Sequence, residues 1–229
     1  MSGPSRCART TSNAAICAAG RPTSPGEVRA VASVRRVWHQ VTEAADPADV
    51  ARVVDGARRS PPRAGGVRVI AIDGPSGSGK TSLANAVSVA LGCPTARMDQ
   101  IFPGWDGLAE AVTLVTEQVL EPLARGEQAA YRTWDWERDR WNGTITVPRS
   151  EFLVLEGCGS SVGSAGAYAA LRVWVDAPRD VRMARGIARD GETYRPHWER
   201  WAAQEDALYA ADGTRARADL IIDTTPTRG

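Results

Sequence analysis

The hydrophobic positions of this chain alternate between short apolar runs and stretches with helical periodicity. The first run, residues 67–72, is apolar and β-branched, which predicts a buried strand. Residues 81–91 place Leu83, Val87 and Leu91 on one face, which predicts a helix. A glycine-rich stretch separates the two, so the predicted order is strand, loop and helix.

The same alternation continues along the rest of the chain. Apolar runs predict strands at residues 95–99, 152–157, 171–176 and 218–223, and helical spacing predicts helices at residues 108–125, 178–190 and 195–210. Strands separated by helices are typical of βαβ units. We therefore expect a three-layer α/β/α fold with a mostly parallel sheet, whose ligands bind beyond the carboxyl ends of the strands.

The first 65 residues differ in composition from the rest. Residues 1–26 are rich in Ser, Thr, Gly, Pro and Ala without periodicity, which predicts a disordered start. Residues 27–43 and 49–57 show helical spacing, and residues 58–66 have the composition of a linker. We expect an N-terminal extension over residues 1–65 and a domain over residues 66–229 that stays soluble without it.

The stretch GPSGSGKTS carries the most specific chemistry in the chain. Residues 74–81 fit G-x-x-x-x-G-K-[ST] at every fixed position, between the strand and the helix that this motif requires. Its glycines let successive backbone N–H groups turn inward at the positive end of the helix. The stretch predicts a nucleoside triphosphate site formed by Gly74, Pro75, Ser76, Gly77, Ser78, Gly79, Lys80, Thr81 and Ser82.

Lys80 is the one lysine among the twenty-eight lysine and arginine residues of the chain. Lysine is a compact point charge, whereas the wide fork of arginine would collide with a loop wrapped tightly around a phosphate. We expect Lys80 to reach the β- and γ-phosphates and the Thr81 hydroxyl to bind Mg²⁺.

Three acidic residues, Asp73, Asp99 and Glu156, stand at or near the ends of predicted strands. Asp73 stands at the entry to the glycine-rich stretch of residues 74–79, the glycine loop, and we expect it to have a structural role. Asp99 and Glu156 are candidates for the carboxylates that phosphoryl transfer needs, one to orient or deprotonate the nucleophile and one to bind the metal. For each, an acid that caps the next helix or binds a surface cation is the alternative.

Arg182, Arg185 and Arg189 recur at i, i+3 and i+7 in the helix predicted over residues 178–190. Such a stripe beside a triphosphate suits a lid that closes on the γ-phosphate. A solvated helix face is the alternative.

A tryptophan-rich stretch, YRTWDWERDRW at residues 131–141, mixes aromatic and charged side chains. This mixture suits a pocket that stacks a ring-shaped ligand and binds its hydroxyl groups, which Trp198 and Trp201 would help to close. An amphipathic hairpin packed on the sheet is the alternative.

Net charge, apolar runs and cysteine spacing limit the partners and the cellular compartment that we expect for this protein. The net charge of +1 gives no indication of binding to nucleic acid or to an anionic membrane. No apolar run approaches the ~18 residues that a membrane-spanning helix needs. The four cysteines form no C-x-x-C pair, which argues against zinc or a disulfide framework. We expect a cytoplasmic protein that acts on a small molecule, and the sequence carries no signal for its oligomeric state.

With these motifs in hand, residues 66–225 resemble the P-loop kinases of the uridine kinase and phosphoribulokinase group. The matching segments, in order, are GPSGSGKTS, RMDQIF, WDW, VLEG and LRVWVDAPRDVRMARGIARD. The resemblance implies a P-loop kinase domain with ATP and Mg²⁺ as cofactors. It implies Asp99 as general base and Arg185 and Arg189 as catalytic lid residues beside Lys80, with Thr81 and Glu156 at the metal. The acceptor contacts expected with it are Asp99, Arg132, Trp134, Asp135 and Glu156.

Departures from that group leave the acceptor open. Gln100 stands where those kinases carry a small residue, and the Arg-Gly-Arg continuation of their lid is absent. We therefore expect an ATP-dependent kinase acting on a hydroxyl of a nucleoside, sugar or similar metabolite. The alternatives are a P-loop switch or motor on a protein partner, although no N-K-x-D string is present, and a nucleotide-binding module without catalysis.

Overall fold

The structure, a computed structural model, describes residues 44–191 and 195–226, so the helix expected at residues 27–43 lies outside it. Its centre is a five-stranded sheet in the order β2-β5-β1-β6-β7, and every pair of neighbouring strands is parallel. The strands are β1 (Arg68–Asp73), β2 (Thr95–Arg97), β5 (Phe152–Glu156), β6 (Ala169–Asp176) and β7 (Leu220–Asp223). The predicted parallel sheet is confirmed.

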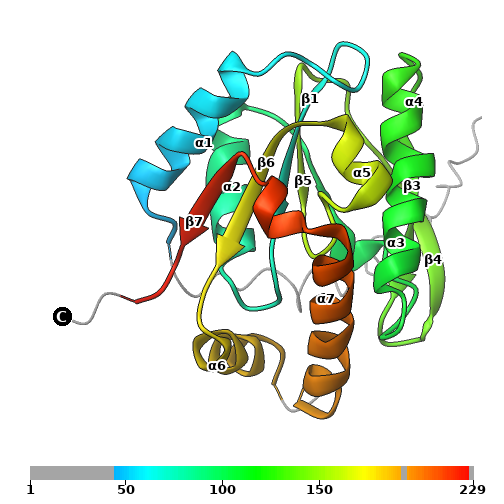
Figure 1. Ribbon diagram of the computed structural model, residues 1–229. Helices are drawn as coiled ribbons and strands as arrows, with labels where there is room; N and C mark the ends of the chain where they lie inside the picture. Colours follow the sequence, from blue (N-terminus) through cyan, green and yellow to red (C-terminus); the bar gives the residue numbers. More distant parts are fainter. Residues whose placement is uncertain (1–43, 192–194, 227–229) are drawn as a thin grey trace, which may run out of the picture.

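Helices cover both faces of the sheet (Figure 1). One face carries α1 (Pro47–Arg59) and α2 (Lys80–Leu91), and the other carries α3 (Leu108–Val115), α5 (Gly163–Tyr168) and α7 (Trp198–Asp212). A π-helical turn (Thr116–Leu120) and α4 (Glu121–Ala124) continue α3, while α6 (Arg179–Asp190) lies beyond the carboxyl end of β6. Within the described residues, short 3-10 turns lie at Met98–Gln100, Arg195–His197 and Thr214–Arg217. The three-layer α/β/α architecture is therefore confirmed.

Strand β1 explains why the sheet needs helices on both sides. Its side chains alternate between two cores, with Ile70 and Ile72 facing α2 and Val69 facing the opposite layer. All three are fully buried, as expected for a central parallel strand that reads as a continuous apolar run. The glycine loop leaves this strand at the carboxyl edge of the sheet, where a doubly covered parallel sheet binds its ligands.

Helix α1 packs on the sheet and is not separated from it. Asp46 caps the helix by accepting a hydrogen bond from the backbone N–H of Ala48 at 2.8 Å. Val53 and Ala57 are fully buried in the same core as Leu83 of α2. The boundary at residue 66 remains a prediction, and this packing favours a boundary ahead of α1.

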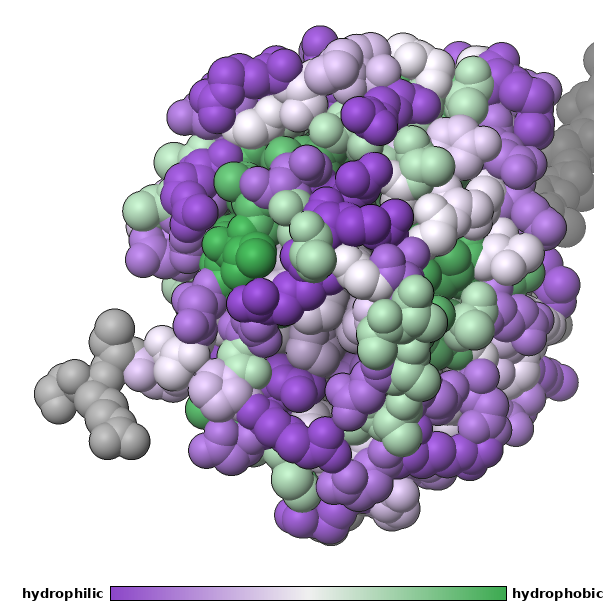
Figure 2. Space-filling model, in the orientation of Figure 1, coloured by the Kyte–Doolittle hydropathy of each residue, from purple (hydrophilic) through white to green (hydrophobic). Residues whose placement is uncertain are grey.

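Strands β3 (Ala130–Asp135) and β4 (Arg140–Thr146) form a separate antiparallel hairpin. This hairpin contains the tryptophan-rich stretch, and it packs beside the 3-10 turn that follows β2 and the π-helical turn. On the face shown in Figure 2, a hydrophobic area lies over β7, the edge strand, where Ile221 is 39% exposed. Within the described residues, no helix combines the length and apolar character needed to cross a membrane.

Candidate active site

The glycine loop wraps tightly at the end of β1. Gly74, Gly77 and Gly79 have φ values of 138°, 79° and 92°, a region that side-chain-bearing residues rarely adopt. A Cβ atom at Gly74 would collide with the carbonyl oxygen of Val175, and one at Gly77 would collide with that of Arg182. The loop can therefore take this path only with glycine at these positions, between β6 and the start of α6.

Lys80 is buried at the first position of α2. Its Nζ atom donates a hydrogen bond to the carbonyl oxygen of Pro75 at 2.9 Å, so the side chain folds back over the loop that precedes it. The phosphate-binding role that the sequence predicted for the lone lysine stays a prediction.

Thr81 and Glu156 lie side by side at the amino end of α2. The Thr81 hydroxyl donates to Glu156 Oε1 at 3.1 Å, while Glu156 Oε2 forms an ion pair of 3.0 Å with Arg97. Arg97 also donates to the side-chain oxygen of Asn85 at 2.6 Å, which fixes its guanidinium. A hydroxyl and a carboxylate are the hard oxygen ligands that Mg²⁺ uses beside nucleotide phosphates, so these two residues fit that ion.

The side chain of Asp73 connects the loops that follow β1 and β5. Its buried carboxylate accepts hydrogen bonds from the backbone N–H groups of Gly74, Gly159 and Ser161 at 2.7–2.9 Å, and from the hydroxyls of Ser161 and Tyr209. Burial raises the pKa of this carboxyl, and the donors oppose that shift. The arrangement ties the glycine loop to the loop after β5, which agrees with the structural role expected for Asp73.

Glu205 of α7 is a second buried carboxylate that has several partners, and no sequence motif points to it. Its Oε1 atom accepts hydrogen bonds from the backbone N–H of Ser76 and the indole N–H of Trp201, both at 2.8 Å. Its Oε2 atom lies 3.8 Å from a guanidinium nitrogen of Arg182. One carboxylate therefore connects the glycine loop, α6 and α7.

Cys158 shares this network. Its Sγ atom donates to Glu205 Oε1 at 3.1 Å and lies 3.5 Å from the Ser76 hydroxyl. Burial raises the pKa of the thiol to about 12, so the sulfur stays protonated at neutral pH. Cys158 therefore acts as a hydrogen-bond donor and does not supply a thiolate nucleophile.

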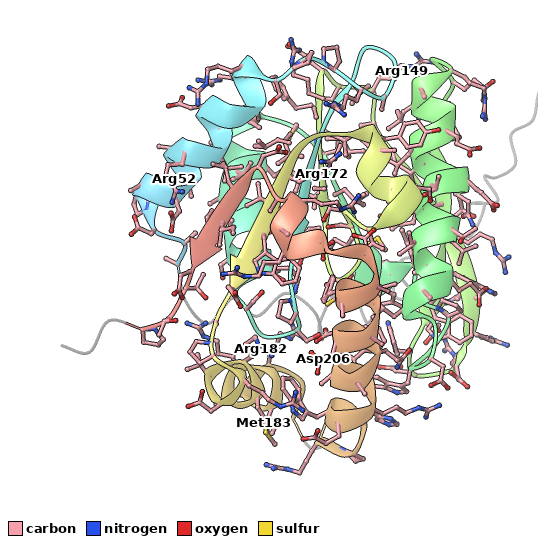
Figure 3. The ribbon with its side chains drawn as sticks, in the orientation of Figure 1. Arg52, Arg149, Arg172, Arg182, Met183 and Asp206 are labelled. Atoms are coloured by element: carbon pink, nitrogen blue, oxygen red, sulfur yellow. The ribbon has the colours of Figure 1, made fainter. Side chains whose placement is uncertain are left out.

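Arg182, Arg185 and Arg189, the three arginines singled out on α6, lie in three different environments. Arg182 is buried and donates to the carbonyl oxygens of Ala177 and Ser76, and Figure 3 shows it between α6 and the strand ends. Arg185 donates twice to Thr224, at 3.0 Å in each case. Arg189 lines a pocket beside the glycine loop. The solvated-face alternative is therefore wrong for Arg182.

This pocket lies beside Gly77 and Lys80 and is partly open to solvent. Asp99 lines it from the 3-10 turn after β2, and Arg189 lines it from α6. Four aromatic residues, Phe102, Trp105, Trp136 and Trp201, form an aromatic wall, and Ser76, Gly157 and Cys158 complete the described lining. The aromatic wall therefore comes from three segments far apart in the sequence: the loop after β2, the hairpin and α7.

The aromatic rings of this wall support one another. Trp105 lies 4.9 Å from Trp136 and 6.2 Å from Trp201 between ring centroids, and it stacks on His197 at 4.2 Å with nearly parallel rings. Phe102 meets Trp201 edge to face at 4.9 Å. The indole N–H of Trp136 donates to the backbone carbonyl oxygen of Asp99 at 2.8 Å, which places the hairpin against the 3-10 turn that carries Asp99.

Other members of the tryptophan-rich stretch lie away from the pocket lining. Asp135 is committed to the hairpin turn, where it accepts hydrogen bonds from the backbone N–H groups of residues 137 and 138 and from the side chains of Arg138 and Asn142. The Arg138 guanidinium helps to hold its pKa below the usual value, against the effect of burial. Arg132 packs over the ring of Trp141, and Trp134 meets the same ring edge to face.

Several residues of the site lie outside the predicted set, and one predicted element differs in the structure. Trp136 is the member of its stretch that lines the pocket, and Trp201 joins it as expected, whereas Trp198 packs near Arg182. Asp99 lies in a 3-10 turn and not in a strand over residues 95–99. One available signal was Glu205, an acid at i+7 on the buried face formed with Trp198, Trp201 and Ala202.

Comparison with known proteins places this site in context. No protein-family profile matches the chain. A cytidylate kinase from Haloarcula marismortui is 31% identical over 127 residues, a match that spans 55% of this chain and 60% of the length of that relative. Among solved structures, a possible uridine kinase from Bacillus stearothermophilus is similar with a TM-score of 0.56 and 23% identity, covering 76% of this chain and 97% of that one.

These similarities establish the fold. The chain has the α/β fold of P-loop kinases, so the resemblance expected from its motifs is confirmed at this level. The two relatives described above are named as a cytidylate kinase and a possible uridine kinase, so their names describe different acceptors.

Proposed function

We propose that this chain is an ATP-dependent kinase that transfers the γ-phosphoryl group to a hydroxyl of a small metabolite. The observation that carries the proposal is the pocket that joins Lys80 and Gly77 of the glycine loop to the carboxylate of Asp99. Phosphoryl transfer needs such a place, where the phosphate, the acceptor oxygen and a carboxylate meet. The similarity to kinases supports the same reaction class.

In this proposal Asp99 acts on the acceptor hydroxyl. The hydroxyl oxygen forms a bond with the γ-phosphorus, the bond from that phosphorus to the β–γ bridging oxygen breaks, and ADP leaves with the electron pair. The proton of the hydroxyl passes to the Asp99 carboxylate. Lys80 and the backbone N–H groups of the glycine loop stabilise the charge on the phosphates.

Two lid arginines have different positions relative to this reaction. Arg189 borders the pocket and is assigned to the transferred phosphoryl group. Arg185 binds Thr224, whose hydroxyl donates to the carbonyl oxygen of Ser78, so we assign Arg185 to the nucleotide side of the glycine loop. Thr81 and Glu156 would hold Mg²⁺, which neutralises phosphate charge when it is bound.

The acceptor wall is assigned to Trp136 and not to Arg132 or Trp134. Trp136 lines the pocket, whereas the other two side chains pack on Trp141 within the hairpin. Asp135 is likewise assigned to the hairpin turn, because both of its oxygens are already bonded there.

The test is ADP release from Mg·ATP in the presence of nucleosides, sugars, sugar acids, vitamin alcohols and simple alcohols. We expect at least one acceptor to raise the rate well above basal hydrolysis, with transfer confirmed by mass spectrometry of the product. The Lys80→Ala variant, purified in the same way, controls for contaminating kinases. A basal ATPase that no acceptor stimulates would contradict the proposal and favour a switch or motor.

A further inference from the structure

The lining of the pocket combines two kinds of chemistry. Lys80 and the glycine loop supply a charged and polar part, and Trp105, Trp136 and Trp201 supply an aromatic part. Among the described lining residues, the charged side chains are Lys80, Asp99 and Arg189, and the proposed reaction uses all three. The part of the acceptor that does not react therefore meets a wall of aromatic rings.

The polar atoms of that wall are largely committed to the protein itself. The indole N–H of Trp136 donates to the backbone oxygen of Asp99, and that of Trp201 donates to Glu205. The Cys158 thiol, which also lines the pocket, donates to Glu205. The rings thus offer the acceptor apolar surface and π-faces, with little capacity to bind additional hydroxyl groups.

This chemistry disfavours three classes of acceptor. A sugar would leave several hydroxyls facing rings that cannot pair with them. A nucleotide would bring a phosphate beside the Asp99 carboxylate, with Arg189 as the arginine on the lining. A cationic amino alcohol would suit the rings but would meet Lys80 and Arg189 in the same pocket.

We propose that the acceptor is an uncharged alcohol whose hydroxyl is carried on a flat aromatic ring, directly or through a methylene group. The ring stacks in the wall of Trp105, Trp136 and Trp201, and its hydroxyl reaches toward Asp99. This inference rests on the proposed kinase function, and it adds the class of substrate to it.

The experiment measures binding and turnover separately. Dissociation constants are measured by calorimetry, in the presence of Mg²⁺ and a non-hydrolysable ATP analogue, for 3-pyridylmethanol and benzyl alcohol, cyclohexylmethanol as the saturated control, glucose, uridine, CMP and choline. We expect the two aromatic alcohols to bind about tenfold more tightly than cyclohexylmethanol, the gain that ring stacking gives. They should also bind more tightly than the sugar, the nucleoside, the nucleotide and the cation.

Variants in one hairpin test the wall itself. Trp136→Leu should weaken binding of the aromatic alcohols about tenfold, because it removes a stacking ring. Trp136→Phe keeps a six-membered aromatic ring and loses the five-membered ring with its N–H, so it should retain most of the affinity. Trp134→Leu, a matched change outside the pocket lining, should leave the affinity unchanged. Thermal melting and analogue binding establish that each variant is folded.

The outcomes separate the acceptor class from the kinase function. Tightest binding by glucose, uridine, CMP or choline, equal binding of cyclohexylmethanol, or no effect of Trp136→Leu would overturn the aromatic-alcohol class. Phosphorylation of a sugar or nucleotide alone would overturn it while supporting the kinase. Aromatic alcohols that bind as expected, with no acceptor phosphorylated, would support the pocket chemistry and contradict the kinase.

Discussion

Both faces of the sheet pack on aliphatic side chains, but among the described residues only one of the two buried clusters also contains aromatic rings. The face under α1 and α2 is packed with aliphatic side chains such as Val53, Ile70 and Val87, and it supports the helix that begins at Lys80. The opposite face contains Phe102 and Trp201, with Trp105 and Trp136 packed against them. The first face orders a loop that a contiguous motif specifies, whereas the second assembles a pocket wall from separate segments.

A short sequence motif can specify the glycine loop, whereas the aromatic wall of the pocket depends on how distant segments pack. The nucleotide side depends on glycines, a lysine and a threonine at fixed spacing, so one short stretch contains most of its chemistry. The proposed acceptor side depends on rings that the hairpin, α7 and the loop after β2 bring together. Glu205 joins the two sides, because it lies on α7 and bonds to Ser76 of the glycine loop.

The largest expected effect is on the nucleotide side. Lys80→Ala should lower kcat by roughly 10³–10⁵, the range seen when a cation that stabilises the transferred phosphoryl group is lost. Lys80→Arg should fail as well, because the wide guanidinium does not fit the loop. Steady-state kinetics measure the loss, and a circular dichroism melt establishes that the fold is intact. Near wild-type turnover by Lys80→Arg would show that the lone lysine is an accident of composition.

On the acceptor side, Asp99→Asn should lower kcat by about 10²–10⁴, which is typical of losing a general base. Its ATP affinity should stay within a few-fold of the wild type, because Asp99 lies on the acceptor side of the pocket. Kinetics and nucleotide binding are measured separately. A variant that raised only the acceptor KM would show that Asp99 binds the acceptor and does not take its proton.

Truncation tests the aliphatic face. A chain that begins at Ala44 keeps α1, whereas one that begins at Gly66 loses α1 and its buried valines. Burial of Val53 and Val54 contributes roughly 3–6 kcal/mol, so the free energy of unfolding should fall by about that amount. Urea denaturation of the two chains measures it. Equal stability would support the boundary at residue 66 that the sequence predicted.

The link between the two sides is tested at Glu205. Glu205→Ala leaves the buried N–H groups of Ser76 and Trp201 without their acceptor, which should lower the free energy of unfolding by about 2–4 kcal/mol. Glu199→Ala, which removes an exposed acid from the same helix, is the matched control and should change stability little. If the two variants unfolded alike, Glu205 would not hold the glycine loop to α7.

The smallest expected effect is at Asp135. Asp135→Asn should lower the melting temperature slightly, since the amide replaces one acceptor oxygen of the hairpin turn, and should leave kcat and the acceptor KM unchanged. The sequence resemblance instead implied a contact with the acceptor. A raised acceptor KM in a folded Asp135→Asn variant would favour that role and bring the hairpin turn into the site.

The sequence by itself determined the parallel α/β architecture and the nucleotide loop. Apolar runs and helical spacing are local properties, and the motif at residues 74–81 requires only a strand before it and a helix after it. The position of Lys80 followed directly, because its neighbours in the sequence are also its neighbours in space.

Only the tertiary structure decided which of the other candidates meet. Trp134 and Trp136 belong to the same stretch, yet the hairpin sends only Trp136 to the pocket lining, where Trp201 from α7 also lies. Arg182 and Arg189 share one helix, yet one is buried under the glycine loop and the other borders the pocket. Such choices depend on how distant segments pack, which local periodicity does not encode.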